Sequence, residues 1–81
     1  MGKVDPIMHS NQKLYFLSFC VEAYKMSHQM SGESVMALFD QKGVTQYLIN
    51  NFEVLHTQGE RWLIDDIDEF IQDHNDTISR Q

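Results

Sequence analysis

Apolar residues fall into four stretches along the chain, and within each they recur every three to four residues, which is the spacing of buried positions on an α-helix. Gly32, Gly43 and Gly59 separate these stretches, as expected where loops divide short helices. The pattern predicts an all-α fold in which four helices form a compact bundle or an orthogonal array. We expect one helical domain over residues 1–81, with an ordered core at about 8–73 and frayed termini.

The first predicted helix begins between Pro6 and Ser10 and runs to about Ser27. Apolar side chains surround most of it. Because a helix that is apolar nearly all round is normally central in its fold, we expect this helix to lie in the core. The alternative is that part of its apolar surface faces another chain. Its polar residues form one narrow stripe, made of Ser18, Glu22, Lys25 and Gln29.

The second and third predicted helices are short and are joined by a tight turn. The second opens at Ser31, a favourable N-cap residue, and ends before Gly43, which suits the left-handed position after a helix. The third starts near Thr45 and ends near His56. Two helices joined in this way resemble a helix-turn-helix, but residues 46–55 contain no Arg or Lys to contact phosphates, so we do not expect DNA binding.

The fourth predicted helix has the clearest start signal in the chain. Thr57 and Glu60 have the spacing of a capping box, in which the two side chains satisfy free backbone donors reciprocally. We expect the helix to end near Asp73. A short strand at residues 62–64 is the alternative, and both the capping box and the continuing helical spacing argue against it. That spacing is carried by Leu63, Ile64, Ile67, Phe70 and Ile71.

Charge and cysteine content narrow the possible functions. The 81 residues carry a net charge of −6, with twelve acids against six Lys and Arg, so binding to a nucleic-acid backbone is not expected. The longest apolar stretch, residues 14–21, is broken by Ser18 and is too short to cross a bilayer. Cys20 is the only cysteine, which excludes an internal disulfide and suits a reducing compartment. With no export signal visible, we expect a cytoplasmic protein.

A run of acidic residues follows Trp62 in the fourth predicted helix. Helical spacing puts Asp66, Glu69 and Asp73 on one surface, one turn after Trp62, with Asp65 beside them. Acids in the second half of a helix oppose its macrodipole, at a cost of roughly 0.3–1 kcal/mol each at exposed sites. One interpretation is a solvated face. The other is a surface that docks a basic protein partner, with Trp62 as its anchor.

No residues have the spacing of a catalytic, cofactor or metal site. The acidic run lacks the irregular backbone and internal glycine of a calcium loop, and the four histidines are widely separated. His56 lies at a helix junction, where it is expected to complete end hydrogen bonds. Cys20 lies within an apolar run, where a thiol is usually inert. We therefore expect a protein without enzymatic activity, cofactor or metal.

An ordered series of short motifs extends over most of the chain. It resembles a family of small bacterial proteins, domain of unknown function family 3791, over roughly residues 16–71. Phe52 and Trp62 depart mildly from the family pattern, where tyrosine is more often expected. The motifs are Phe19-Cys20-Val21-Glu22-Ala23-Tyr24-Lys25, Ser31-Gly32, Val35, Leu38-Phe39, Gly43-Val44, Tyr47-Leu48-Ile49, Leu55-His56-Thr57, Gly59, Asp66-Ile67 and Phe70-Ile71.

The resemblance implies a role in binding another protein. Members of the family look like the small partners encoded beside ADP-ribosyltransferase-like toxins, which would make this chain an antitoxin that binds and neutralises such a toxin. The family has no established functional residues to carry over. The alternative is a self-associating structural or adaptor domain, in which apolar surface left on the first helix closes a homodimer.

Overall fold

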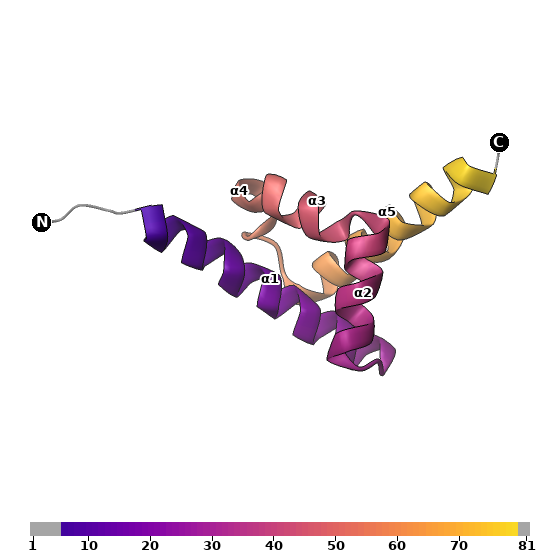
Figure 1. Ribbon diagram of the computed structural model, residues 1–81, viewed down its shortest axis with the longest axis horizontal. Coiled ribbons are helices and arrows are strands. Elements are labelled where there is room, and N and C mark those ends of the chain that lie inside the picture. The colour runs from indigo at the N-terminus through magenta and orange to yellow at the C-terminus, as the bar shows by residue number, and fades with distance from the viewer. Residues whose placement is uncertain (1–5, 80–81) are drawn as a thin grey trace, which may run out of the picture.

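The computed structural model describes residues 6–79, and it describes the side chains of residues 11–73. Within these residues it contains helices and no strand, which confirms the predicted all-α class (Figure 1). The helices are α1 (Pro6–His28), α2 (Gly32–Lys42), α3 (Val44–Asn50), α4 (Phe52–Leu55) and α5 (Glu60–Ser79).

The long helix α1 contacts α2, α3 and α5, but the prediction that it lies in the core is only partly right, because its outward side remains exposed. It begins and ends close to the predicted positions. Gln29 then takes a left-handed conformation (φ 54°), and the amide of Met30 donates back to the carbonyl of Lys25 over 3.0 Å. Only one side of α1 is buried, although apolar residues surround the helix. The buried side comprises Phe16, Cys20, Val21, Ala23 and Tyr24.

Helix α2 has the predicted ends. The hydroxyl of Ser31 accepts a hydrogen bond from the amide of Ser34 over 3.1 Å, which satisfies one of the free donors at the helix start. Gly43 follows the last residue, Lys42, with a φ of 77° that glycine adopts without a steric penalty. The sequence therefore determined both ends of α2 through local chemistry.

The predicted third helix is two helices, α3 and α4, which are separated at Asn51. This residue leaves the helical conformation (φ −112°, ψ 23°), and its side-chain amide donates to the carbonyl of Tyr47 over 2.8 Å. Asparagine side chains compete in this way for backbone groups and so interrupt helices. The prediction of one continuous helix to His56 was wrong because it considered only the apolar spacing.

Helix α5 differs from its prediction at both ends. The helix begins at Glu60, and the amide of Leu63 donates to the carbonyl of Gly59, so Gly59 occupies the N-cap position. Thr57 forms no capping box, because its hydroxyl donates to the carbonyl of Val54 over 2.9 Å at the end of α4. The helix continues to Ser79 and does not end near Asp73. The alternative of a strand at residues 62–64 is excluded.

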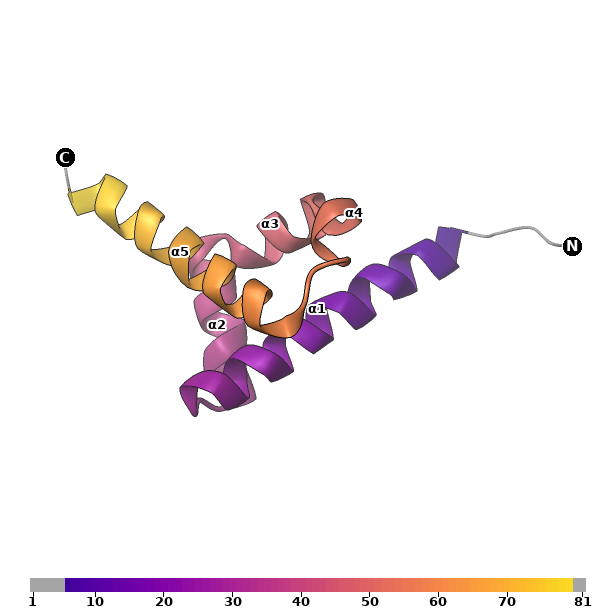
Figure 2. The same cartoon turned by 180° about the vertical axis from the view of Figure 1, so that it is seen from behind.

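The helices cross one another, as in an orthogonal array. Figure 1 shows α2 standing steeply across the direction of α1, and Figure 2 shows α5 from its other side. The N-terminal part of α1 and the C-terminal part of α5 extend in opposite directions, and the molecule measures 53 × 28 × 22 Å. The predicted fraying stays a prediction only for residues 1–5 and 80–81, which lie outside the described part, since residues 74–79 are helical.

One core of buried apolar side chains joins all five helices. Aromatic rings hold two of the contacts in it: Phe16 meets Phe52 edge to face at 5.5 Å, and Tyr24 meets Phe39 at 5.3 Å. Such pairs stabilise a core beyond the area they bury, by roughly 0.5–1.5 kcal/mol each. The core comprises Phe16, Cys20, Val21, Ala23, Tyr24, Val35, Phe39, Val44, Leu48, Phe52, Leu55, Leu63, Ile64 and Ile67.

Candidate functional site

Helix α5 presents its acids outward because its apolar residues recur at helical spacing. Leu63, Ile64 and Ile67 are buried against the rest of the core, and Phe70 and Ile71 are partly buried beside them. The positions between these residues point to the other side of the helix. Burial of one stripe therefore fixes which side chains of α5 face solvent.

The predicted partner-binding residues do not all lie in the same environment. Trp62, Asp65, Glu69 and Asp73 are exposed, and 46% of the surface of Trp62 is accessible. The guanidinium of Arg61 lies 4.0 Å from a carboxylate oxygen of Asp65, in a pair that is largely in solvent and so contributes little to stability. Asp66 is only half-exposed.

Asp66 is held by the neighbouring helix α3. The hydroxyl of Tyr47 donates a hydrogen bond of 2.6 Å to Oδ2 of Asp66, and the Tyr47 ring stacks on Phe70 with centroids 4.3 Å apart. Burial, together with this hydrogen bond and the negative charge of Asp66, raises the pKa of Tyr47 to about 12. This carboxylate therefore serves packing between α3 and α5, in addition to any contact with a partner.

Asp68 forms the corresponding contact on the other edge of α5. Its Oδ1 accepts a 2.7 Å hydrogen bond from the hydroxyl of Tyr24, and its Oδ2 lies 3.1 Å from Nε2 of His28. The rings of Tyr24 and His28 pack with centroids 4.1 Å apart. Burial raises the pKa of Tyr24, and the hydrogen bond and charge of Asp68 raise it further.

The two Tyr–Asp hydrogen bonds fix the rotation of α5 about its own axis. Asp66 and Asp68 lie on opposite edges of the helix, one bonded to α3 and the other to α1. Their positions leave Trp62, Asp65 and Glu69 on the outward side between them. We call these three residues, together with Asp73, the α5 surface. A shallow hollow lined partly by Asp65 and Glu69 lies on it.

Sequence reasoning found the acids of the α5 surface but missed the tyrosines that position them. Tyr24 and Tyr47 lie 44 and 19 residues from the acids they bond. Helical spacing relates only residues three or four positions apart, so it carries no signal for these contacts. The one available signal is chemical, because a tyrosine on a buried stripe usually needs a partner for its hydroxyl.

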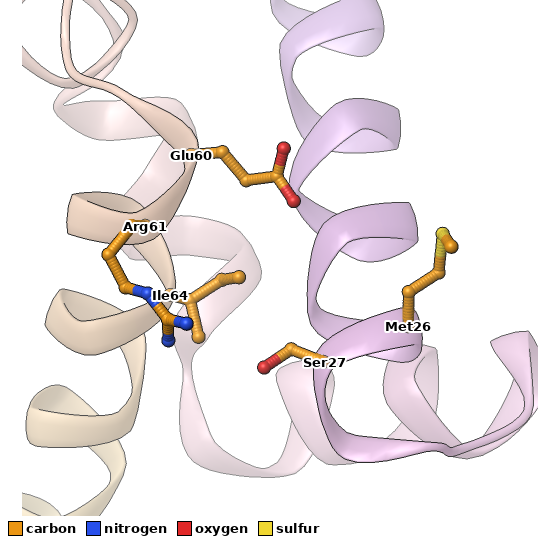
Figure 3. A pocket seen from close by; sticks show the side chains of 5 residues that line it. All are labelled: Met26, Ser27, Glu60, Arg61 and Ile64. Carbon is orange, nitrogen blue, oxygen red and sulfur yellow. The ribbon is translucent and has the colours of Figure 1, made fainter.

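A second hollow lies between α1 and α5, and Figure 3 shows the side chains around it. Glu60 reaches from α5 toward α1, and Ser27 points into the gap, whereas Met26 points away from it. Arg61 and Ile64 complete the lining. The hollow brings together one carboxylate, one guanidinium and one hydroxyl, with no nucleophile hydrogen-bonded to a base among these five residues.

Cys20 and His56 both lie where a structural role suits them. Cys20 is buried, which raises the pKa of its thiol to about 12. His56 follows the end of α4, and its Nδ1 lies 2.8 Å from the carbonyl of Phe52, as predicted for a histidine at this junction. Among the residues whose side chains are described, no three His, Cys, Asp or Glu side chains gather to hold a metal ion.

No helix in residues 6–79 is long and apolar enough to cross a membrane.

The core and the α5 surface together lie within a segment that matches a known family. The model of the family described as Protein of unknown function (DUF3791) matches residues 15–74, which is most of the chain. The chain belongs to the DUF3791 family. The predicted resemblance over residues 16–71 is thereby confirmed, and the DUF3791 match includes every residue of the α5 surface. No curated protein and no solved structure matches the chain.

Proposed function

We propose that this chain is a non-catalytic protein-binding module that docks a basic partner on its α5 surface. The observation that carries the proposal is the exposure of Trp62 beside Asp65 and Glu69, on a face whose direction is set by Tyr24 and Tyr47. A tryptophan left half in water on a small domain is a favourable anchor, since Trp is enriched among the residues that dominate binding energy.

The distribution of charge supports a basic partner. Asp65 and Glu69 lie in the middle of α5, beyond the first turn in which the macrodipole favours acids, so the macrodipole does not account for them. In an interface with Lys and Arg side chains, the same acids steer association and disfavour acidic competitors. With a net charge of −6, the whole chain attracts such a partner.

The family resemblance supports a more specific role. We propose that the partner is an ADP-ribosyltransferase-like toxin encoded beside this chain, and that binding neutralises the toxin in the bacterial cytoplasm. Enzymes that bind a dinucleotide need basic groups near its phosphates. An acidic surface with an aromatic anchor complements a site of that kind, and occupation of the site would block the substrate.

Co-expression of the chain with the product of the adjacent gene tests the proposal. We expect a stable complex that purifies through a tag on the partner, and we expect the chain to restore growth of cells that produce the toxin. Trp62→Ala should reduce the amount of chain recovered, whereas Val54→Ala, at an exposed apolar residue outside the α5 surface, should not. Absence of a complex, or equal recovery of both variants, would contradict the proposal.

A second candidate function is self-association as a structural or adaptor domain. The exposed apolar side chains on the outward side of α1 favour it, since burial of that side is incomplete in a single copy. This candidate uses a different face of the molecule from the α5 surface.

A further inference from the structure

Tyr47 lies at the border between the α5 surface and helix α3. It is partly buried, and its hydroxyl donates to Oδ2 of Asp66 over 2.6 Å. Its ring stacks on Phe70 with an angle of 18° between the planes, which fixes the direction of the hydroxyl. Burial and the bond to Asp66 raise the pKa of Tyr47, and the charge of Glu69 raises it further. The phenol oxygen therefore lies near two carboxylates of α5.

The two acids that α5 shares with neighbouring helices differ in their free oxygens. Both oxygens of Asp68 have a partner, since Oδ1 accepts from Tyr24 and Oδ2 lies 3.1 Å from Nε2 of His28. Within residues 11–73, the side chain of Asp66 has one hydrogen-bond partner, Tyr47, which bonds Oδ2. Oδ1 of Asp66 is therefore available to a donor from another molecule.

Asp66 also lies closer than Asp68 to the middle of the α5 surface. With 3.6 residues per turn, Asp66 is about 40° around the helix from Trp62, whereas Asp68 is about 120° from it in the other direction. A partner that contacts Trp62 can reach Asp66 from the same side of the helix. Asp68 instead faces α1, where Tyr24 bonds it.

A carboxylate that is already held in place loses less freedom when a partner binds it. Asp65 and Glu69 are exposed, and immobilising a side chain of this kind lowers affinity by roughly twofold to tenfold. Tyr47 holds Asp66 before the partner arrives, so little of this loss remains for Asp66. The carboxylate with one free oxygen is thus also the one whose position is fixed in advance.

We propose that Tyr47 is a positioning residue for partner binding, whose hydrogen bond presents Oδ1 of Asp66 to a Lys or Arg side chain of the partner. This role rests on the proposed function of the α5 surface. It deepens that function by extending the docking surface from α5 to the edge of α3. It also makes a residue that lies 19 positions from Asp66 in the sequence decisive for affinity.

Binding kinetics with the immobilised adjacent-gene product test this role. We expect Tyr47→Phe to raise Kd by about threefold to tenfold, mainly through faster dissociation. Tyr24→Phe is the matched control, because it removes the same kind of bond from Asp68. An effect transmitted through the direction of α5 would occur in both variants, whereas an effect through Asp66 is confined to Tyr47→Phe. Equal Kd values for the two variants would overturn the proposal.

A double-mutant cycle shows whether Tyr47 acts through Asp66. Asp66→Asn keeps the size of the side chain and removes its charge, and we expect it to raise Kd by about tenfold. Addition of Tyr47→Phe to this variant should raise Kd no further, because the residue that Tyr47 positions no longer attracts the partner. Additive effects in variants that circular dichroism shows to be folded would overturn the proposal.

Two further measurements distinguish failure of this role from failure of the proposed function. If the wild-type chain does not bind the adjacent-gene product, both proposals fail. If it binds, and Trp62→Ala weakens the complex while Tyr47→Phe does not, the α5 surface remains the docking site and only the role of Tyr47 is overturned.

Discussion

The hydroxyl of Tyr47 donates a 2.6 Å hydrogen bond to Oδ2 of Asp66, which links the short helix α3 to the acidic helix α5. Asp66 was predicted from sequence as a partner-binding residue, and the structure gives it a second role inside the molecule. Together with the Tyr24–Asp68 hydrogen bond, this contact holds Trp62 and its acidic neighbours outward.

Removal of the Tyr47 hydroxyl should therefore destabilise the fold. We expect Tyr47→Phe to lower the free energy of unfolding by about 1–2 kcal/mol, because a half-exposed carboxylate loses a hydrogen bond and only partly recovers it from water. Urea denaturation measures the change. Tyr15→Phe, at a tyrosine that is 73% exposed, is the matched control and should have no effect. Equal stability of the two variants would show that the contact does not contribute.

Stability should fall in alkaline solution. Tyr47 has a pKa of about 12 in the folded chain against 10.0 for an unperturbed phenol, and the thiol of Cys20 has a pKa of about 12 against 9.0. As pH rises through this interval, the unfolded chain releases protons that the folded chain retains, so unfolding becomes more favourable. The contribution is complete below about pH 9 and is lost as the pH approaches 12.

Urea midpoints measured between about pH 8 and pH 11 would detect this loss. The decline above about pH 10 should be shallower in Tyr47→Phe, which has no phenol to ionise at this position. The same slope in Tyr47→Phe and the wild type would contradict the assignment of that part of the loss to Tyr47.

Substitution by alanine should destabilise the fold at Gly43 but not at Gly32. Gly43 has a φ of 77°, with no atom within 4 Å of the added Cβ, so the cost of Gly43→Ala is conformational and about 1 kcal/mol. Gly32 opens α2 with the same free space and an ordinary φ. Gly32→Ala should therefore maintain the stability or raise it by up to about 1 kcal/mol. Thermal unfolding of both variants is the measurement, and a stabilised Gly43→Ala would refute the explanation.

Cys20 should be protected from thiol reagents. Its burial and raised pKa leave little thiolate at neutral pH, and reaction requires local or global opening. We expect labelling in native buffer to be slower than in denaturant by about 1,000-fold or more, which matches the stability of a domain of this size. Rapid native labelling would mean that α1 opens readily at this position.

The accuracy of the sequence predictions depended on the range of the interactions involved. The ends of α2 depend on Ser31 and Gly43 alone, and both were predicted. The break at Asn51 arises from a side-chain competition that apolar spacing does not detect, although two successive asparagines were a usable signal. Thr57 and Glu60 have the three-residue spacing of a capping box, but in the structure the hydroxyl of Thr57 donates to the carbonyl of Val54 at the end of α4.

For the candidate site, too, local spacing predicted some features, and the packing between helices determined the others. Helical spacing correctly placed Trp62, Asp65 and Glu69 on the exposed side of α5. It assigned Asp66 to the same surface and did not find its bond to Tyr47, because that contact depends on how α3 packs against α5. Likewise, the all-round apolar character of α1 was predicted, but only the packing of the other helices determines which side remains exposed.

Calorimetric titration of the adjacent-gene product with charge variants tests the proposed partner binding most directly. Asp65→Asn combined with Glu69→Gln removes two exposed acids from the α5 surface and leaves Asp66 and Asp68 in their internal hydrogen bonds. Glu33→Gln combined with Glu53→Gln removes two exposed acids elsewhere and is the matched control. We predict that the first pair raises Kd by about tenfold or more and that the second leaves it nearly unchanged. Equal Kd values for the two double variants would contradict binding through the α5 surface.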